Sequence, residues 1–275
     1  MLLRALPLAT LLAAALAAPR DLFLRPARFV VPADARITVD VVNGTFDSSV
    51  AALPAAHLAD LTLAGPAGRR TLPRTDWGTS GDRAVLQLRT GAPGIYVLGV
   101  STHARTIAMP GAQFDAHLEQ VGRRDVLEAR RAAGTAGRAA TERYAKHVKA
   151  LLHVGAARDS GWARVLGYGA EIVPLADPYG LHAGDSLAVR CLVNGRPAAG
   201  LPVYAGGADA GVADARAQIG EQALRTDADG VVRLRLPAAG PAWVRFIHMT
   251  PTGAPGGPEY ESQWATLTFA VPPAP

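Results

Sequence analysis

Residues 186–195, SLAVRCLVNG, show most clearly how this chain folds. Apolar side chains alternate with small or polar ones, so that Leu187, Val189, Cys191 and Val193 share one face of an extended strand. The Asn-Gly pair that ends the segment is a strong signal for a tight hairpin turn. The segment therefore predicts an antiparallel strand with one buried face.

Short alternating segments of the same kind recur along most of the chain. Turns separate them, in keeping with 29 Gly and 21 Pro among 275 residues. One such segment, residues 37–41, runs into Asn43-Gly44, where we expect a second hairpin turn. Many short strands at this spacing are typical of β-sandwiches.

We expect an all-β fold with two β-sandwich domains joined by a short helical segment. The N-terminal sandwich spans residues 18–111, and the C-terminal domain, residues 141–275, resembles an immunoglobulin or transthyretin-like sandwich. Residues 112–140 form the helical connection, because apolar side chains in its first part have helical spacing. The pattern of residues 141–154 fits both a helix and a strand, and we prefer the strand.

The N-terminus has the features of a secretory signal peptide over residues 1–17. Arg4 precedes an apolar stretch, and Ala15 and Ala17 stand at the −3 and −1 positions of a cleavage site. We therefore expect a periplasmic or secreted protein. Cys191 is the only Cys, so the mature chain has no Cys for a lipid anchor and no internal disulfide. No later apolar stretch has the length of a membrane span.

The formal net charge of +5 does not indicate nucleic-acid binding. Lysine occurs only at Lys146 and Lys149 among 28 Lys and Arg residues, and an Arg excess beside abundant Ala, Gly and Pro is typical of G- and C-rich codons. Basic residues never run beyond two in a row, and no aromatic side chains interleave them. Both lysines fall within residues 142–149, ERYAKHVK, which we interpret as a solvated polar face.

No catalytic signature occurs in the sequence, and we do not expect an enzyme. Residues 226–230, TDADG, resemble the start of a calcium loop but lack the later Glu, so a β-turn is preferred. The seven His residues show no metal-ligand spacing. His248 is the exception to examine, because a hairpin after it would place it near Tyr260 and Glu261. His248 and Glu261 are the candidate metal ligands, and a His hydrogen-bonded to a carboxylate at a sheet edge is the open alternative.

Several segments together resemble a family of periplasmic proteins of largely unknown function, often labelled periplasmic components of cobalt and nickel uptake systems. The matching stretches are DLFLRP at 21–26, ERYAKHVK at 142–149, EIVPLADPY at 171–179, GD at 184–185, TDADG at 226–230 and ESQWATLTF at 261–269. The resemblance implies a transthyretin-like C-terminal domain and a role with nickel, cobalt or a related metal. In many members of this family the mature N-terminal sequence resembles His-Asp-Phe-Trp. This chain has RDLF at 20–23 in its place, and Arg20 cannot ligate a cation.

The functional expectation is an exported, non-catalytic binding protein. The resemblance implies that its partners are a transition-metal ion, nickel or cobalt, and an inner-membrane transporter. A structural or carbohydrate-contacting module of the cell envelope is the alternative.

Overall fold

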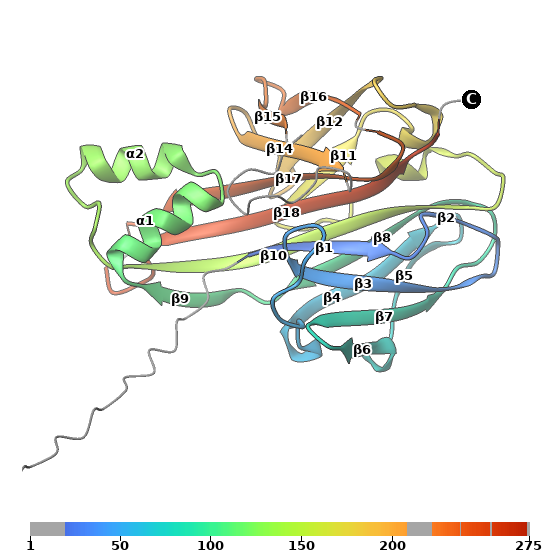
Figure 1. Ribbon diagram of the computed structural model, residues 1–275, viewed down its shortest axis with the longest axis horizontal. Helices are drawn as coiled ribbons and strands as arrows, with labels where there is room; N and C mark the ends of the chain where they lie inside the picture. Colours follow the sequence, from blue (N-terminus) through green and yellow to red (C-terminus); the bar gives the residue numbers. More distant parts are fainter. Residues whose placement is uncertain (1–19, 208–221, 237, 254, 274–275) are drawn as a thin grey trace, which may run out of the picture.

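Three β-sheets and two α-helices make up the described part of the chain (Figure 1). The computed structural model describes residues 20–207, 222–236, 238–253 and 255–273. The predicted signal peptide, residues 1–17, lies outside these residues. Within the described ranges, no helix is long and apolar enough to cross a membrane.

The two smaller sheets are antiparallel and come from different parts of the chain. The first sheet consists, in spatial order, of β1 (Asp21–Pro26), β3 (Arg36–Gly44), β7 (Arg83–Arg89) and β6 (Trp77–Ser80). The third sheet consists of β11 (Ala170–Pro174), β12 (Ser186–Val193), β13 (Arg196–Pro197) and β16 (Val231–Arg235). In β12 the predicted face is buried, because Leu187, Val189 and Cys191 are each 0% exposed.

The central sheet lies between the two smaller ones and contains strands from both halves of the sequence. Its main path is β15 (Gln222–Arg225), β14 (Pro202–Gly207), β17 (Gly240–Pro251), β18 (Tyr260–Val271), β10 (Ala140–Val154), β8 (Gly94–Thr102), β4 (Leu58–Gly65) and β5 (Gly68–Thr71). Two further strands, β2 (Val30–Val31) and β9 (Arg105–Met109), also pair with β10. β10 runs parallel to β18 and antiparallel to β8.

Two hydrophobic cores fill the spaces on either side of the central sheet. Val148, Ala150 and Leu152 of β10 belong to the core beneath the first sheet, and Leu151 belongs to the core beneath the third sheet. The segments 18–111 and 141–275 therefore share one continuous sheet, and the boundary expected between them is not a boundary between sheets.

The strand predicted for residues 141–154 is confirmed by β10. Residues 145–152 are buried on both faces, and such a stretch loses the polar and apolar alternation that distinguishes a strand from a helix. The interpretation of residues 142–149 as a solvated face is wrong. Glu142 is 0% exposed, Lys146 6% and Lys149 2%, because these side chains lie between β10 and the layers packed against it.

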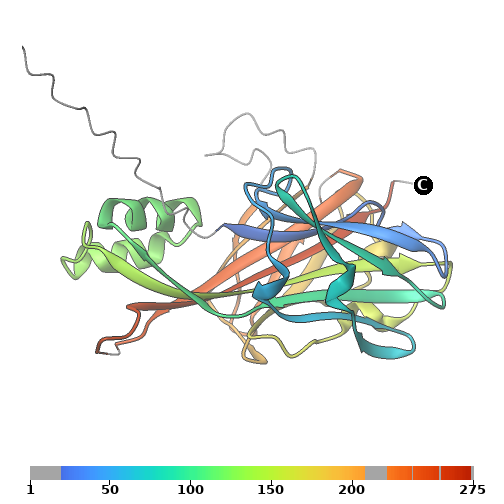
Figure 2. The same ribbon diagram turned by 90° about the horizontal axis from the view of Figure 1, so that it is seen from below.

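The expected helical segment is present as α1 (Gly111–Gln120) and α2 (Arg124–Ala132). Figure 2 shows both helices at one end of the molecule, beyond the two smaller sheets. Phe114 and Leu118 of α1 pack with Ile247 and Trp264 from β17 and β18. The short 3-10 helices are η1 (Ala55–His57), η2 (Arg74–Asp76), η3 (Ser160–Ala163) and η4 (Pro178–Gly180).

The two Asn-Gly pairs behave differently. Asn194 and Gly195 both adopt the left-handed conformation, with φ of 50° and 75°, as a tight hairpin turn requires. The hairpin turn predicted at Asn43-Gly44 is wrong, since both residues lie within β3, which pairs with β1 and β7. The turn interpretation of residues 226–230 is confirmed, because the Asp227 carboxylate accepts the backbone N–H groups of the turn.

Candidate functional site

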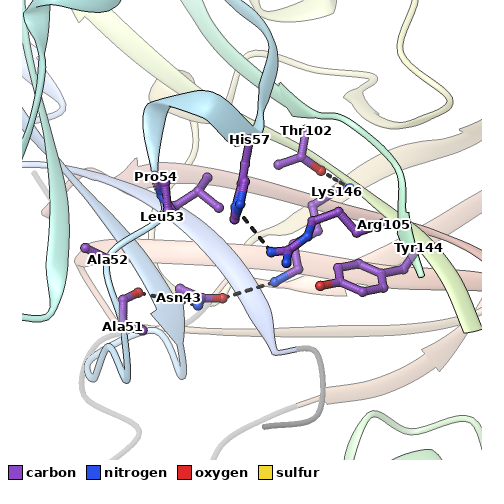
Figure 3. A pocket seen from close by; sticks show the side chains of 10 residues that line it. All are labelled: Asn43, Ala51, Ala52, Leu53, Pro54, His57, Thr102, Arg105, Tyr144 and Lys146. Carbon is purple, nitrogen blue, oxygen red and sulfur yellow. Dashed lines mark hydrogen bonds between the residues drawn. The ribbon is translucent and has the colours of Figure 1, made fainter. Parts of the chain in front are cut away.

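A cavity of about 250 Å³ lies where the first sheet, η1 and the central sheet meet (Figure 3). We call it the Lys146 pocket. Its polar side chains are Asn43, His57, Thr102, Arg105, Tyr144 and Lys146, and residues 51–54 supply its remaining wall. No Asp or Glu is among the described residues that line it.

Five elements bring these polar side chains together. Asn43 comes from the end of β3, His57 from η1, and Thr102 and Arg105 from the end of β8 and the start of β9. β10 contributes Lys146 and Tyr144, which are two residues apart and therefore share one face of the strand. The Thr102 hydroxyl accepts the Lys146 backbone N–H over 2.9 Å, which holds β10 against the end of β8.

Lys146 is a buried amine whose hydrogen-bond partner is a neutral amide. Its Nζ donates to Asn43 Oδ1 over 3.0 Å and lies 5.7 Å from the centre of the Trp264 ring. Burial lowers the pKa of Lys146 to about 8, against the opposing effect of the carboxylates of Asp21 and Glu142. Within the described residues these two carboxylates form their close contacts elsewhere, Asp21 with Arg245 at 3.5 Å and Glu142 with His117 at 3.2 Å.

Arg105 and His57 supply the other charged or titratable groups of the pocket. An Arg105 Nη1 lies 3.3 Å from His57 Nδ1, and because a guanidinium only donates, Nδ1 accepts this hydrogen bond. Burial and the positive charges of Arg105 and Lys146 lower the pKa of His57. The neutral imidazole therefore carries its proton on Nε2. Arg105 is exposed and Lys146 is buried, so the pocket leads from solvent to the amine.

Lys149 contrasts with Lys146, although only three residues separate them. Lys149 Nζ forms an ion pair with Glu171 at 3.1 Å, and both side chains are 2% exposed. Glu171 also accepts the backbone N–H groups of residues 166–168 at 2.7–2.9 Å. Lys149 therefore neutralises a buried carboxylate that fixes the loop before β11.

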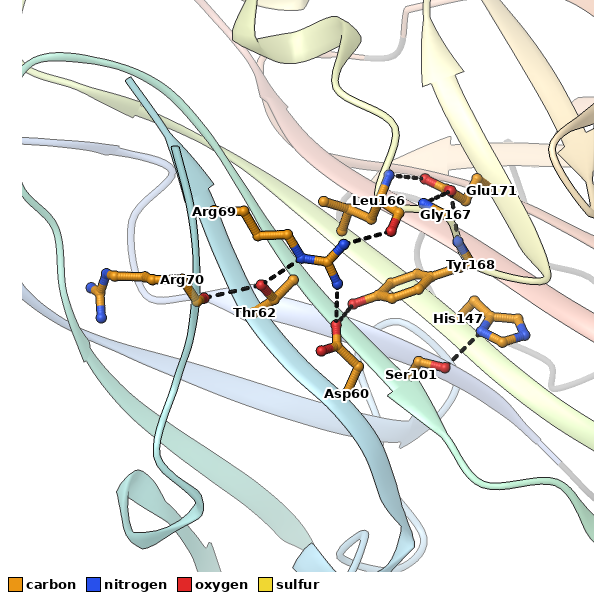
Figure 4. A network of polar contacts seen from close by, with 10 residues as sticks. All are labelled: Asp60, Thr62, Arg69, Arg70, Ser101, His147, Leu166, Gly167, Tyr168 and Glu171. Carbon is orange, nitrogen blue, oxygen red and sulfur yellow. Dashed lines mark hydrogen bonds and ion pairs between the residues drawn. The ribbon is translucent and has the colours of Figure 1, made fainter. Parts of the chain in front are cut away.

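A second polar network lies next to this ion pair (Figure 4). Ser101 Oγ lies 2.9 Å from His147 Nδ1, and His147 Nε2 lies 2.7 Å from Gln263 Oε1. The Tyr168 ring stacks on His147, and its hydroxyl donates to Asp60 over 2.5 Å. Sequence reasoning missed the Ser101 and His147 contact, because 46 residues separate the two side chains.

A further buried pair underlies the helices. His117 Nε2 of α1 lies 3.2 Å from Glu142 Oε2, and both side chains are 0% exposed. Ser262 donates to the other oxygen of Glu142 and accepts the indole N–H of Trp264 over 2.9 Å. The network attaches α1 to β10 and β18.

The structure places the candidate metal ligands His248 and Glu261 on neighbouring strands. His248 of β17 lies opposite Gln263, and Glu261 lies opposite Thr250, two positions along β18. The Glu261 carboxylate forms an ion pair with Arg143 of β10. Burial and the charge of Arg123 lower the pKa of His248. Among the described residues, no three His, Cys, Asp or Glu side chains form a group suited to a metal ion.

The sequence contained one signal for the Lys146 pocket that pattern reading did not use. A chain with 28 Lys and Arg residues retains Lys at only two positions, and both lie within one short segment. The burial of Lys146 and Lys149 depends on strands that are remote in sequence. The same strands determine that only Lys149 meets a carboxylate.

Comparisons with known proteins give a family and distant structural likenesses. No curated protein matches the chain. Two fibronectin type III domains of chicken tenascin match with 13% identity and a TM-score of 0.22, covering 92% of this chain and 98% of that one. Elastase-activated alpha-2-macroglobulin of Escherichia coli matches with 12% identity and a TM-score of 0.24, covering 92% of this chain and 20% of that one.

The family comparison covers most of the sequence. Residues 17–250 match the model of a domain of unknown function, DUF4198. The matched range includes all six polar residues of the Lys146 pocket. This chain therefore belongs to the DUF4198 family.

Proposed function

We propose that this chain is an exported, non-catalytic binding protein whose ligand is a small organic anion held in the Lys146 pocket. One observation carries the proposal: Lys146 and Arg105 line the same cavity, and no described carboxylate lines it with them. An anion in the pocket would supply the charge partner that neither cation finds in its walls.

The energetics of Lys146 support an anionic ligand. Removing an ammonium group from water is costly, and the cost is offset when an opposite charge lies beside it. Asn43 Oδ1 gives a hydrogen bond but no net charge. A bound carboxylate would therefore stabilise the charged amine and raise the pKa of Lys146.

The shape of the site supports a carboxylate as the anionic group. Arg105 at the exposed side presents a planar guanidinium, which pairs with a carboxylate through two parallel hydrogen bonds. Leu53 and Pro54 give the opposite wall apolar surface. A volume of about 250 Å³ fits a small molecule of a few carbon atoms and is too small for a polymer.

The metal association implied by the family resemblance stays a prediction. Arg143 holds the Glu261 carboxylate, so a nickel or cobalt ion at His248 and Glu261 has to displace that ion pair. The export of the chain and its partnership with an inner-membrane transporter are also predictions.

Calorimetric titration of the purified mature chain with lactate, propionate, succinate and phosphate tests the proposal. We expect one stoichiometric site for at least one of the carboxylates, with an affinity that falls as salt rises. Lys146→Met and Arg105→Gln should each weaken binding.

The matched control is Arg36→Gln, which removes one positive charge from an exposed side chain at the opposite end of β3 from Asn43. Its affinity should equal that of the wild type. The proposal is wrong if none of the three carboxylates binds more tightly than about 1 mM, or if Arg36→Gln weakens binding as much as Arg105→Gln does.

A further inference from the structure

The two lysines of this chain occupy comparable positions with different partners. Both project from the buried middle of β10, and both are at most 6% exposed. Lys149 meets the Glu171 carboxylate, whereas Lys146 meets the Asn43 amide and faces the pocket. The structural role that explains Lys149 therefore does not explain Lys146.

An arginine at position 146 would supply the same positive charge as Lys146 but would lack one chemical property. Arg supplies nearly all positive charge in this chain, and it already does so within the same pocket at Arg105. An amine differs from a guanidinium because it can lose a proton near neutral pH and expose a nucleophilic lone pair. A buried amine beside a second cation is the environment that activates lysine as a nucleophile.

The contacts around Nζ leave the amine available for reaction. Asn43 Oδ1 accepts one N–H, and the neighbouring rings of Tyr144 and Trp264 supply no further acceptor oxygen at hydrogen-bond distance. With its pKa lowered to about 8 by burial, half of the Lys146 amines are neutral near that pH. The neutral amine keeps its hydrogen bond to Asn43 and still has a free lone pair.

We propose that Lys146 Nζ captures the carbonyl carbon of a small 2-oxo acid as a reversible imine, while Arg105 binds the carboxylate of the same molecule. This inference rests on the proposed anion site and names its ligand class. A 2-oxo acid fits because it carries a carboxylate and an electrophilic carbon on adjacent atoms.

The reaction needs no oxidant, reductant or additional reactant. The Nζ lone pair forms a bond to the carbonyl carbon, and the carbonyl π electrons move to oxygen, which takes up a proton released by nitrogen. The nitrogen loses its second proton as the C–O bond breaks, so that the amine and the ketone give an imine and water. His57 Nδ1 already accepts an N–H of Arg105, so these protons pass through solvent, which reaches the cavity on the exposed Arg105 side.

Reductive trapping tests the inference directly. The full mature chain is incubated with pyruvate or glyoxylate and sodium cyanoborohydride, and the labelled peptides are mapped by mass spectrometry. We expect a saturable adduct at Lys146 and none at Lys149, which is the internal control. Excess propionate, which has a carboxylate but no carbonyl, should slow the labelling by competing for Arg105.

Two variants separate the amine from the anion site. Arg105→Gln should reduce the initial rate of labelling at Lys146 at least about tenfold, because it removes the bidentate partner of the carboxylate. Lys146→Arg retains the charge, so it should keep propionate binding and lose the adduct. The Arg105→Gln experiment remains informative if Lys146→Arg does not fold.

The outcomes distinguish this inference from the proposed function. If propionate binds in calorimetry but Lys146 of the wild type is not labelled, the imine is wrong and the anion site stands. If no 2-oxo acid and none of lactate, propionate and succinate binds, both the imine and the anion site are wrong. Equal labelling of Lys146 and Lys149, or labelling that does not saturate, also overturns the inference.

Discussion

Lys146 Nζ donates a hydrogen bond to Asn43 Oδ1 over 3.0 Å, and this contact joins the central sheet to the end of β3 in the first sheet. The two residues are 103 positions apart in the chain. Because the acceptor is a neutral amide, the contact satisfies the amine without neutralising it. Lys146 therefore lowers the free energy of unfolding, and its charged amine is suited to binding a ligand.

Replacing Lys146 by Met should not destabilise the protein at pH 7. The substitution removes the cost of burying a charge and keeps the length and apolar stem of the side chain, so we expect the free energy of unfolding to rise by about 1–3 kcal/mol. Urea denaturation measures this change. A loss of more than about 1 kcal/mol would show that Lys146 contributes to stability.

The same pair of proteins should differ in alkaline solution. The pKa of Lys146 is about 8 in the folded chain and 10.5 for an ordinary Lys, so between these values the unfolded chain binds the extra proton. The free energy of unfolding of the wild type should therefore increase relative to that of Lys146→Met as pH rises from 8 to 10.5. Parallel stability curves for the two proteins over this range would contradict the lowered pKa.

Replacing Lys149 by Met should have the opposite effect on stability. It leaves the Glu171 carboxylate buried without its ion-pair partner, and breaking such a pair costs about 3 kcal/mol or more. The double variant Lys149→Met with Glu171→Gln should recover part of this loss. If the single variant is as stable as the wild type, the Lys149–Glu171 ion pair does not stabilise the fold, and the contrast with Lys146 is wrong.

His147 should make the protein less stable in mild acid. Burial lowers its pKa below the ordinary value of 6.5, so the unfolded chain takes up a proton at a pH where the folded chain does not. The contribution of His147 to the free energy of unfolding is therefore fully present above pH 6.5. It is lost as the pH falls from 6.5 toward the pKa that His147 has in the folded chain. Urea denaturation at several pH values should give a shallower pH dependence for His147→Gln than for the wild type. His103→Gln, at an exposed position, is the control and should keep the wild-type slope.

Titration with nickel and cobalt tests the metal association. The family resemblance predicts a stoichiometric site tighter than about 1 mM, which His248→Ala or Glu261→Ala should weaken. Arg143→Gln releases the Glu261 carboxylate from its ion pair and should strengthen binding. If both alanine variants keep the wild-type affinity, the ion is held elsewhere, and if the wild type binds neither ion, the metal association is wrong.

Local pattern was a good guide wherever one face of a strand meets a core. β12 and its Asn194-Gly195 turn follow from alternation and turn chemistry, which act over a few residues. The same rules failed at Asn43-Gly44, because pairing with Leu22 and Asp21 of β1 keeps these two residues extended. They were ambiguous in β10, because its residues 145–152 are buried on both faces and their sequence has no polar, solvent-facing side.

The amino-acid sequence by itself determined the strand-rich class, the helical interruption, the single buried thiol and the restriction of lysine to two nearby positions. Only the tertiary structure decided what those lysines do, because their partners come from strands remote in the chain. Glu171 reaches Lys149 from β11, whereas Lys146 reaches the Asn43 amide and a cavity built by five elements. Burial and charge balance depend on what packs around a side chain, and no local pattern in β10 records that.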